Sequence, residues 1–304
     1  MADTPARSHM ADTPANGGDW LRGHRAALIL TFDIDAESCM LAEGRRYAGH
    51  PNVMSHQAFG PLVGVPRILD MLNAQRVRAT FFIPGVTADR YPELIRRIDA
   101  EGHEIGHHSH SHRAPQLLTE DEERRDFEQG LEALDQLGIQ PRGHRSALWA
   151  AKWTTASLVA EFGLRYESNQ MDDDRPYLLE TGCGTIAEIP PHWSWDDFPQ
   201  YAYLWEPDVG RTVVPPSTAV KVWAEELDAL REYGGALVLN AHPFLSGRAS
   251  RVAAIRALIE QARAWGDVEV LTAGEAAERI FGDPNAAKRK HEPLQADSAL
   301  YPNY

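Results

Sequence analysis

The chain has 304 residues, of which 43% are hydrophobic and 24% charged, so it can bury one barrel-sized core or two smaller ones. Its formal net charge of −14 argues against a nucleic-acid or anionic-membrane partner, because a phosphate-binding surface needs clustered Lys and Arg. No apolar run approaches the ~20 residues that span a bilayer, and the two cysteines, Cys39 and Cys183, make no disulfide framework.

The first 19 residues are polar and repeat the pentapeptide ADTPA at 2–6 and 11–15. The repeat indicates a cloning scar or a duplicated start, and we expect 1–19 to be a disordered N-terminal extension. This stretch contains no hydrophobic signal region. Together with the unpaired cysteines, this favours a reduced, cytoplasmic protein.

Apolar runs and helical periodicities alternate along the rest of the chain. The run AALILTF at 26–32 predicts a buried strand, which is followed by a Gly- and His-rich loop. Pro61 then opens a helix with an apolar face at Leu62, Val65, Leu69 and Leu72. The further predicted strands are 78–83, 103–106, 142–145, 164–168, 185–190, 236–242 and 268–271. The further predicted helices are 91–100, 119–137 (opened by a capping box at 119–122), 153–162, 217–233, 251–265 and a last one ending near Phe281.

Repeated strand–helix units favour parallel pairing, and hence an α/β layer or barrel. We expect one catalytic domain over 20–283 and an irregular C-terminal tail over 284–304, to which the basic run 288–290 belongs. In such folds the functional groups gather at the carboxyl ends of the strands.

Two aspartates end the first predicted strand. Asp33 and Asp35 are two residues apart, so with the strand period their carboxylates point to the same side. Two like charges that close are costly unless a cation lies beside them. The pair therefore indicates a cation site, the alternative being two solvated loop acids.

The stretch GHHSHSH at 106–112 holds four of the 13 histidines of the chain. His108 and His112 are four apart, which puts both side chains on one side if the segment turns helically. With Asp35 they would form the three-ligand set of a catalytic zinc site, which keeps one position open for water. His107 and His110 face away from that side and are expected to have structural or supporting roles. For His108 and His112 the alternative is a hydrogen-bonded loop residue.

These motifs resemble those of the polysaccharide deacetylase superfamily (carbohydrate esterase family four). The resemblance is carried by TFDID at 31–35, EIGHHSHSH at 104–112, GHRSA at 143–147 and LVLNAHP at 237–243, and it extends over about residues 26–281. It implies a distorted (β/α)7 barrel of the polysaccharide deacetylase type, with the site at the strand ends. It also implies the following roles: Asp33 as catalytic base, Asp35, His108 and His112 as metal ligands, Arg145 as the residue that positions the base, and His242 as general acid.

Some positions depart from the pattern of the family. The third motif reads Arg145-Ser-Ala-Leu-Trp149 in place of Arg-Pro-Pro-Tyr-Gly, which alters a wall of the groove, and Ile34 separates the two aspartates. With DAES at 35–38, MDDDRPY at 171–177 and EIPPHWSWDD at 188–197, the departures resemble a branch of peptidoglycan-deacetylase-like proteins and cyclic imide hydrolases. By this likeness Glu37 is a further site candidate, unless it is an exposed acid. Asp173 is the candidate for the acid that keeps His242 protonated, unless it lies in a solvated turn.

The resemblance implies hydrolysis of a non-peptide carbon–nitrogen bond by metal-activated water. A small cyclic imide or related amide is the favoured substrate, because peptidoglycan lies outside the cytoplasm and 1–19 contains no export signal. N-deacetylation of an N-acetylated sugar in a peptidoglycan or chitin-like polysaccharide is the alternative, and a non-catalytic ligand-binding barrel is a remote third.

Two further features bear on ligands and partners. Trp193 and Trp195 belong to an aromatic segment at 192–205 that would stack on sugars, roof a small pocket, or pack between subunits. The ligand set Asp-His-His suits Zn²⁺, and Co²⁺, Ni²⁺ and Mn²⁺ also accept mixed nitrogen and oxygen donors. We expect a homo-oligomer without predicting its symmetry.

Overall fold

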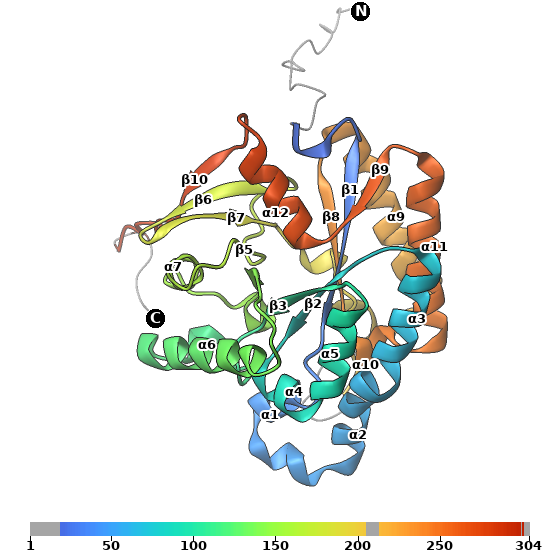
Figure 1. Ribbon diagram of the computed structural model, residues 1–304, viewed down its shortest axis with the longest axis vertical. Helices are drawn as coiled ribbons and strands as arrows, with labels where there is room; N and C mark the ends of the chain where they lie inside the picture. The colour runs from blue at the N-terminus through green and yellow to red at the C-terminus, as the bar shows by residue number, and fades with distance from the viewer. Residues whose placement is uncertain (1–18, 205–212, 299, 301–304) are drawn as a thin grey trace, which may run out of the picture.

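The computed structural model describes residues 19–204, 213–298 and 300, and it shows one sheet surrounded by helices (Figure 1). The strands are β1 (Ala26–Asp33), β2 (Thr80–Ile83), β3 (Glu104–His107), β4 (Gly143–His144), β5 (Tyr166–Glu167), β6 (Tyr177–Thr181), β7 (Gly184–Glu188), β8 (Ala236–Ala241), β9 (Val268–Leu271) and β10 (Lys288–Lys290). The helices are α1 (Ser38–Glu43), α2 (Pro51–Phe59), α3 (Val65–Gln75), α4 (Gly85–Arg90), α5 (Pro92–Ala100), α6 (Glu120–Asp135), α7 (Thr155–Glu161), α8 (Phe198–Tyr201), α9 (Pro216–Tyr233), α10 (Pro243–Ser246), α11 (Ala249–Trp265) and α12 (Ala273–Gly282). The predicted extension 1–19 lies outside the described residues, except for Asp19.

The strand order is β10-β6-β7-β5-β4-β3-β2-β1-β8, and β9 also pairs with β1. All these pairings are parallel except the β6–β7 hairpin. β1 pairs with three strands, namely with β8 along most of its length, with β9 at its start and with β2 at its end. The carboxyl ends of β1, β2, β3, β4 and β8 therefore lie together, and the predicted α/β class is confirmed.

The sheet is not closed into a ring by ladders between the strands that the structure describes. An isolated parallel bridge instead connects Asp196, in the segment after β7, with Asn240 near the end of β8, the last strand of that order. The amide of Asp197 donates to the carbonyl oxygen of Asn240 at 3.1 Å. This arrangement is compatible with the distorted barrel that the sequence predicts, and it brings the segment after β7 to the strand ends.

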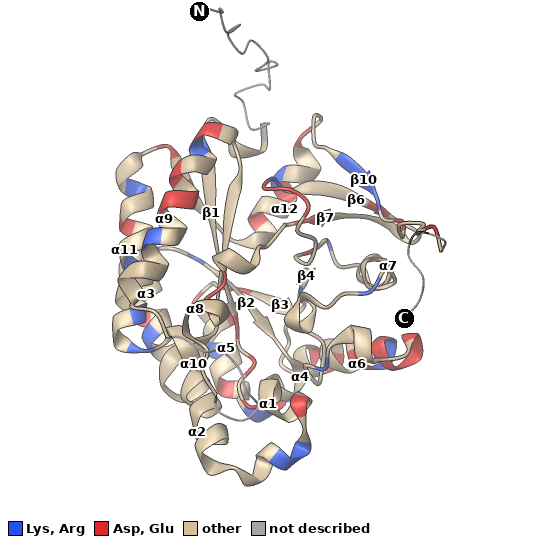
Figure 2. Ribbon diagram, turned by 180° about the vertical axis from the view of Figure 1, so that it is seen from behind, with Lys and Arg blue, Asp and Glu red and all other residues tan. Residues whose placement is uncertain are grey.

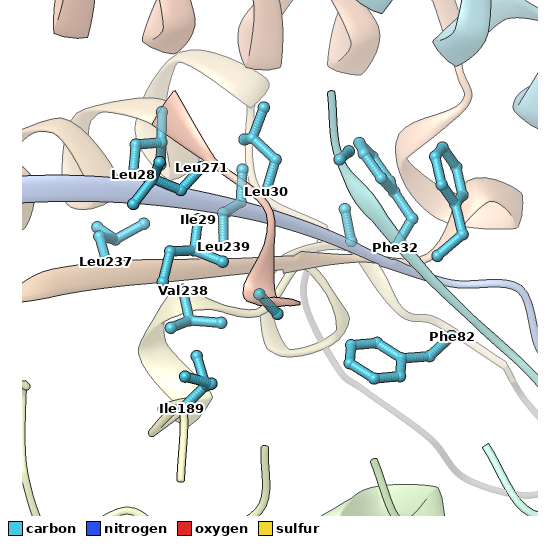
Figure 3. Packing of buried hydrophobic residues seen from close by; sticks show 14 of the residues in the cluster. Leu28, Ile29, Leu30, Phe32, Phe82, Ile189, Leu237, Val238, Leu239 and Leu271 are labelled. Atoms are coloured by element: carbon cyan, nitrogen blue, oxygen red, sulfur yellow. The ribbon is translucent and has the colours of Figure 1, made fainter. Parts of the chain in front are cut away.

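The core lies on both faces of the central strands. All eight residues of β1 are buried, as the unbroken apolar run predicts for a strand covered on both sides. Leu28 and Leu30 project from one face of β1 toward Leu271, whereas Ile29 projects from the other face with Val238 (Figure 3). Charged residues lie along outer helices such as α6, α9 and α11, and β1 is free of them until its lower end (Figure 2). None of the helices in the described ranges has the length and apolar character needed to cross a membrane.

The chain between β1 and β2 differs from the loop that we expected. It forms α1, a 3-10 helix at Arg45–Gly49, α2 and a π-helical turn at Gly60–Gly64 before α3 begins. A π turn closes its hydrogen bonds one residue later than an α turn. The side chains of the π turn are therefore rotated away from the apolar face of α3. Leu62 is therefore 65% exposed, while Val65 and Leu69 are buried. The predicted helix is correct only from Val65 onward.

The predicted tail also contains regular structure. Residues 288–290 form β10, which pairs with β6, a strand that the sequence pattern did not indicate. Arg289 forms ion pairs with Asp172 and Asp173 and lies over the ring of Tyr177. Residues 288–290 are therefore part of the folded unit, and the prediction of an irregular tail is wrong for them.

Candidate metal and catalytic centre

Asp35, His108 and His112 meet just beyond the carboxyl ends of β1 and β3. Asp35 Oδ1 lies 3.4 Å from His108 Nε2, and Asp35 Oδ2 lies 3.3 Å from His112 Nε2. One nitrogen or oxygen atom from each residue lies within 4.8 Å of the other two. The three side chains are buried, so their donor atoms face one another with little solvent between them.

The two histidines converge by a different route from the helical turn that their spacing predicts. The chain forms no helix between β3 and His112. Instead, Ser109 (φ 61°) and His112 (φ 59°) adopt the left-handed conformation, which non-glycine residues rarely occupy. Strained backbone of this kind persists only where the surrounding structure holds it, and it is concentrated at functional sites.

The donor set fits a divalent ion. Asp35 Oδ1 is buried without a hydrogen-bond partner among the described residues, a costly state for a carboxylate oxygen that a cation would relieve. His108 Nδ1 lies 2.6 Å from the carbonyl oxygen of Arg145, so the ring donates there and keeps its Nε2 lone pair available for a cation beside Asp35. Tetrahedral zinc with ligands at about 2.1 Å places neighbouring ligand atoms about 3.4 Å apart. The two distances from Asp35 to the histidines agree with that spacing.

Asp33 adjoins this cluster and is held by two donors. Arg145 Nη1 donates to Asp33 Oδ1 at 2.8 Å, and Asn240 Nδ2 donates to Asp33 Oδ2 at 3.0 Å. Arg145 is fully buried, and its Nη2 donates to Ser168. Asp33 Oδ2 lies 4.0 Å from His108 Nε2. The carboxylate is therefore oriented beside the ligand set by a buried guanidinium, without belonging to that set.

His242 follows β8 and approaches the cluster from the side of that strand. Its Nε2 lies 3.6 Å from Asp35 Oδ2, and its Nδ1 donates to Asp197 Oδ1 at 2.7 Å. Burial alone would lower the pKa of His242, but Asp196, Asp197 and Asp35 outweigh it and raise that pKa well above the usual value. Burial raises the pKa of Asp196 to about 7, against the lowering effect of His242. The raised pKa favours the protonated form of His242, whose Nε2 faces the cluster.

Sequence reasoning missed three residues of this centre, namely Asp196, Asp197 and Asn240. Asp197 also accepts hydrogen bonds from the backbone amide of His242 and from Ser246. Asn240 Nδ2 donates to Asp196 as well as to Asp33, so it links the two sides of the centre. A signal for Asn240 was present, because residues 240 and 242 share one side of a strand by its period of two. A signal for the two acids was present only in the DD pair that ends EIPPHWSWDD.

Three of the predicted site residues lie elsewhere. Glu37 is buried and pairs with Arg90 of α4, so it does not face the centre. Asp173 pairs with Arg289 and Arg175 and is not the acid that contacts His242. Trp195 is 3% exposed and belongs to the hydrophobic core.

The remaining histidines of the 106–112 stretch have other contacts. His107 Nδ1 lies 2.9 Å from His144 Nδ1, and His107 Nε2 lies 3.1 Å from the carbonyl oxygen of Phe127. Burial, followed by the charge of His108, lowers the pKa of His107 to about 3, which keeps its ring neutral. His110 is half-buried, and its backbone amide donates to Asp126. Both lie outside the ligand cluster, as their positions in the stretch predict.

The centre lines a cavity of about 270 Å³. Its remaining lining residues are Cys39, Leu148, Trp149, Trp193, Phe198 and Pro199. Leu148 and Trp149, in the segment that departs from the family motif, are two consecutive left-handed residues (φ 58° and 54°). Trp193 is 61% exposed and stands at the cavity mouth, whereas Trp205 lies outside the described residues.

Comparisons with known proteins agree on one family. A profile described as polysaccharide deacetylase matches residues 59–166. A peptidoglycan deacetylase of Helicobacter pylori is 26% identical over 275 residues, which is 81% of this chain and 93% of that protein. A crystal structure of a Mycobacterium smegmatis protein assigned to the polysaccharide deacetylases is 42% identical, with a TM-score of 0.86 over 90% of this chain and 96% of that one. The Puue allantoinase is 22% identical, with a TM-score of 0.78 over 94% of this chain and 100% of that one, a likeness of fold alone.

Proposed function

The chain belongs to the polysaccharide deacetylase family, and from that premise we propose that it opens the ring of a small cyclic imide or hydrolyses a related small amide. The protein is a hydrolase that acts on carbon–nitrogen bonds, as members of this family do. The second candidate is N-deacetylation of an N-acetylated sugar, which the peptidoglycan deacetylase relative favours. The fold does not distinguish the two candidates, because both a protein assigned to the polysaccharide deacetylases and an allantoinase have it.

Asp35, His108 and His112 would hold one divalent ion. Mixed carboxylate and imidazole donors suit Zn²⁺, and they also accept Co²⁺, Ni²⁺ or Mn²⁺. When bound, such an ion supplies Lewis acidity, which acidifies water and polarises a carbonyl group.

The remaining residues would move the protons. Asp33, oriented by Arg145 and Asn240, takes a proton from the attacking water as the bond from oxygen to the carbonyl carbon forms. His242 gives its Nε2 proton to the departing nitrogen as the carbon–nitrogen bond breaks. Transfer of the proton from Asp33 back to His242 restores the starting state. A cyclic imide and water thus yield one amic acid, whereas an N-acetylated sugar would yield acetate and an amine.

The observation that carries the imide over the sugar is the lining of the cavity. Apart from the residues of the centre, the lining is apolar and offers only a thiol and two indole N–H groups. A sugar carries more hydroxyl groups than this lining has hydrogen-bond partners for, and each hydroxyl group that loses water without gaining a partner is unfavourable. A cyclic imide carries its polar atoms on the group that meets the centre, and the rest of its ring is apolar.

A parallel assay on metal-loaded protein tests the proposal. Initial rates would be measured on glutarimide and on an N-acetylglucosamine oligomer, each with and without a chelator. We expect ring opening of glutarimide that the chelator abolishes. Acetate release from the oligomer alone would select the second candidate, and unchanged rates in the chelator would contradict a metal-dependent reaction.

Replacing Asp197 with asparagine should move the alkaline limb of the kcat/KM profile to lower pH. The negative charge of Asp197 helps to raise the pKa of His242, so the variant loses the Nε2 proton at lower pH. Loss of one neighbouring carboxylate predicts a displacement of about 1–3 pH units. Asp173→Asn, which removes a carboxylate paired with Arg289, is the matched control and should leave the profile unchanged. An unmoved limb in Asp197→Asn would exclude His242 as the group that titrates.

A further inference from the structure

A second, larger cavity opens beside the reaction centre. It has a volume of about 490 Å³ and shares Cys39, His112, Leu148 and Phe198 with the cavity that the centre lines. The two cavities therefore adjoin, and His112 lies in the wall of both. The volume of the second cavity alone is in the range of sites for drug-sized ligands, about 300–1,000 Å³.

The inner wall of the second cavity is apolar. α1 contributes Met40 and Ala42, α10 contributes Phe244 and Leu245, and Ala202 follows α8. Met40, Ala202, Phe244 and Leu245 are each at most 5% exposed. The segment between β1 and β2 contributes only the α1 part of this wall, and it does so because it forms helices in place of the loop that the sequence predicts.

The polar lining residues do not make the cavity a site for a charged group. Gln57 also lines the cavity, and its buried Oε1 has no hydrogen-bond partner among the described residues. Glu43 and Arg113 are exposed and lie at the rim, together with Leu117 and Tyr203. Burial, followed by the charges of two arginines, lowers the pKa of His56, which is therefore neutral at pH 7. A charged group inside would be desolvated without an opposite charge, whereas an apolar group would gain by leaving water.

We propose that the second cavity binds an aryl or branched alkyl substituent carried by the amide or imide whose carbonyl group lies at the reaction centre. The inference rests on the proposed function and narrows its substrate class. Preferred substrates are then cyclic imides or amides with a bulky apolar substituent, and unsubstituted rings leave the second cavity filled with water. One methylene in a hydrophobic pocket already changes kcat/KM by about 10–200-fold. A phenyl ring should therefore change it by at least about 10-fold.

The test compares glutarimide with 3-phenylglutarimide on the metal-loaded full chain. In the wild type, kcat/KM should be at least about 10-fold higher for the phenyl compound. Ala42→Trp places an indole in the second cavity and should reduce that ratio at least about 10-fold. Ala48→Trp adds the same side chain at an exposed position of the neighbouring 3-10 helix and should keep the wild-type ratio. A ratio near one in the wild type, or an unchanged ratio in Ala42→Trp, would overturn the inference.

A binding assay tests this inference even if the proposed reaction does not occur. If neither imide is hydrolysed, calorimetric titration of metal-loaded Asp33→Asn with both compounds replaces the rate assay. At least about 10-fold tighter binding of the phenyl compound, lost in Asp33→Asn/Ala42→Trp, would support the cavity and reject only the reaction. Equal binding of the two compounds would overturn the inference. A third result would also overturn it: Ala42→Trp changes the molecular mass of the protein in solution but leaves the preference for the phenyl compound unchanged. The cavity would then be a contact with a second copy of the chain.

Discussion

Asp33→Asn should lower kcat by about 10²–10⁴-fold and leave the metal content of the protein unchanged. General-base catalysis contributes about that factor, and an amide cannot accept the proton of the attacking water. Asp33 is not in the ligand set: its Oδ2 lies 4.0 Å from His108 Nε2, and its two oxygens accept from Arg145 and Asn240. The measurements are kcat on the hydrolysed substrate and elemental analysis after dialysis against one equivalent of metal.

Asp267→Asn is a suitable control for this substitution. It also replaces a carboxylate that is bonded to an arginine, Arg231, but it precedes β9, away from the carboxyl ends of the strands. We expect its kcat to remain within about twofold of wild type, in line with the small effects of surface substitutions. Full activity in Asp33→Asn would exclude Asp33 as the base. Loss of metal from that variant would place it among the ligands.

The residues at the strand ends could be predicted because the signals for buried parallel strands are local. An apolar run of seven residues before Asp33 already indicates a strand covered on both faces. Parallel strands bring their carboxyl ends to one edge, so Asp33, Arg145 and His242 could be placed together without knowledge of the sheet order. The structure brings these three residues to one centre with Asp35 and the two histidines.

The helices between β1 and β2 could not be predicted in the same way. α2 buries only Val53 and Gln57, and two positions are too few to define a helical period. The burial of this segment depends on contacts with distant parts of the chain, such as the packing of α2 against α10. The sequence therefore predicted which side chains meet at the strand ends better than the shape of the cavity that surrounds them.

The partner of His242 was missed for a related reason. Asp197 lies 45 residues before His242, in a segment whose link to β8 is one isolated bridge. Asp173 lies in an equally acidic turn, and composition does not distinguish one acidic turn from another. Only the position of the chain after β7 decides which acid reaches β8. That position follows from the tertiary packing, which no short window of sequence contains.

Asp35→Ala should abolish metal binding and activity together. Asp35 supplies the only carboxylate of the proposed ligand set, and both of its oxygens face histidine nitrogens at 3.3–3.4 Å. Loss of a group that merely supports a ligand costs about 10–100-fold in metal affinity, so loss of a ligand should cost more. Thermal unfolding gives a readout that does not need turnover. At a metal concentration 100 times Kd, the wild type should gain about 2.7 kcal/mol in free energy of unfolding, and Asp35→Ala should gain none.

Glu37→Gln is the matched control, because it also changes a buried carboxylate two residues from Asp35. Its partners are Arg90 and Tyr91, and it faces away from the ligand cluster. Its free energy of unfolding should fall when the pairing with Arg90 is lost, but the increase caused by metal should equal that of wild type. An increase that persists in Asp35→Ala would place the ion on other residues, since two neutral histidines alone leave its charge uncompensated. If none of the four candidate metals raised the free energy of unfolding of the wild type, the centre would not bind a metal ion. The close approach of Asp35 to His108, His112 and His242 would then have to be explained by protonated histidines alone.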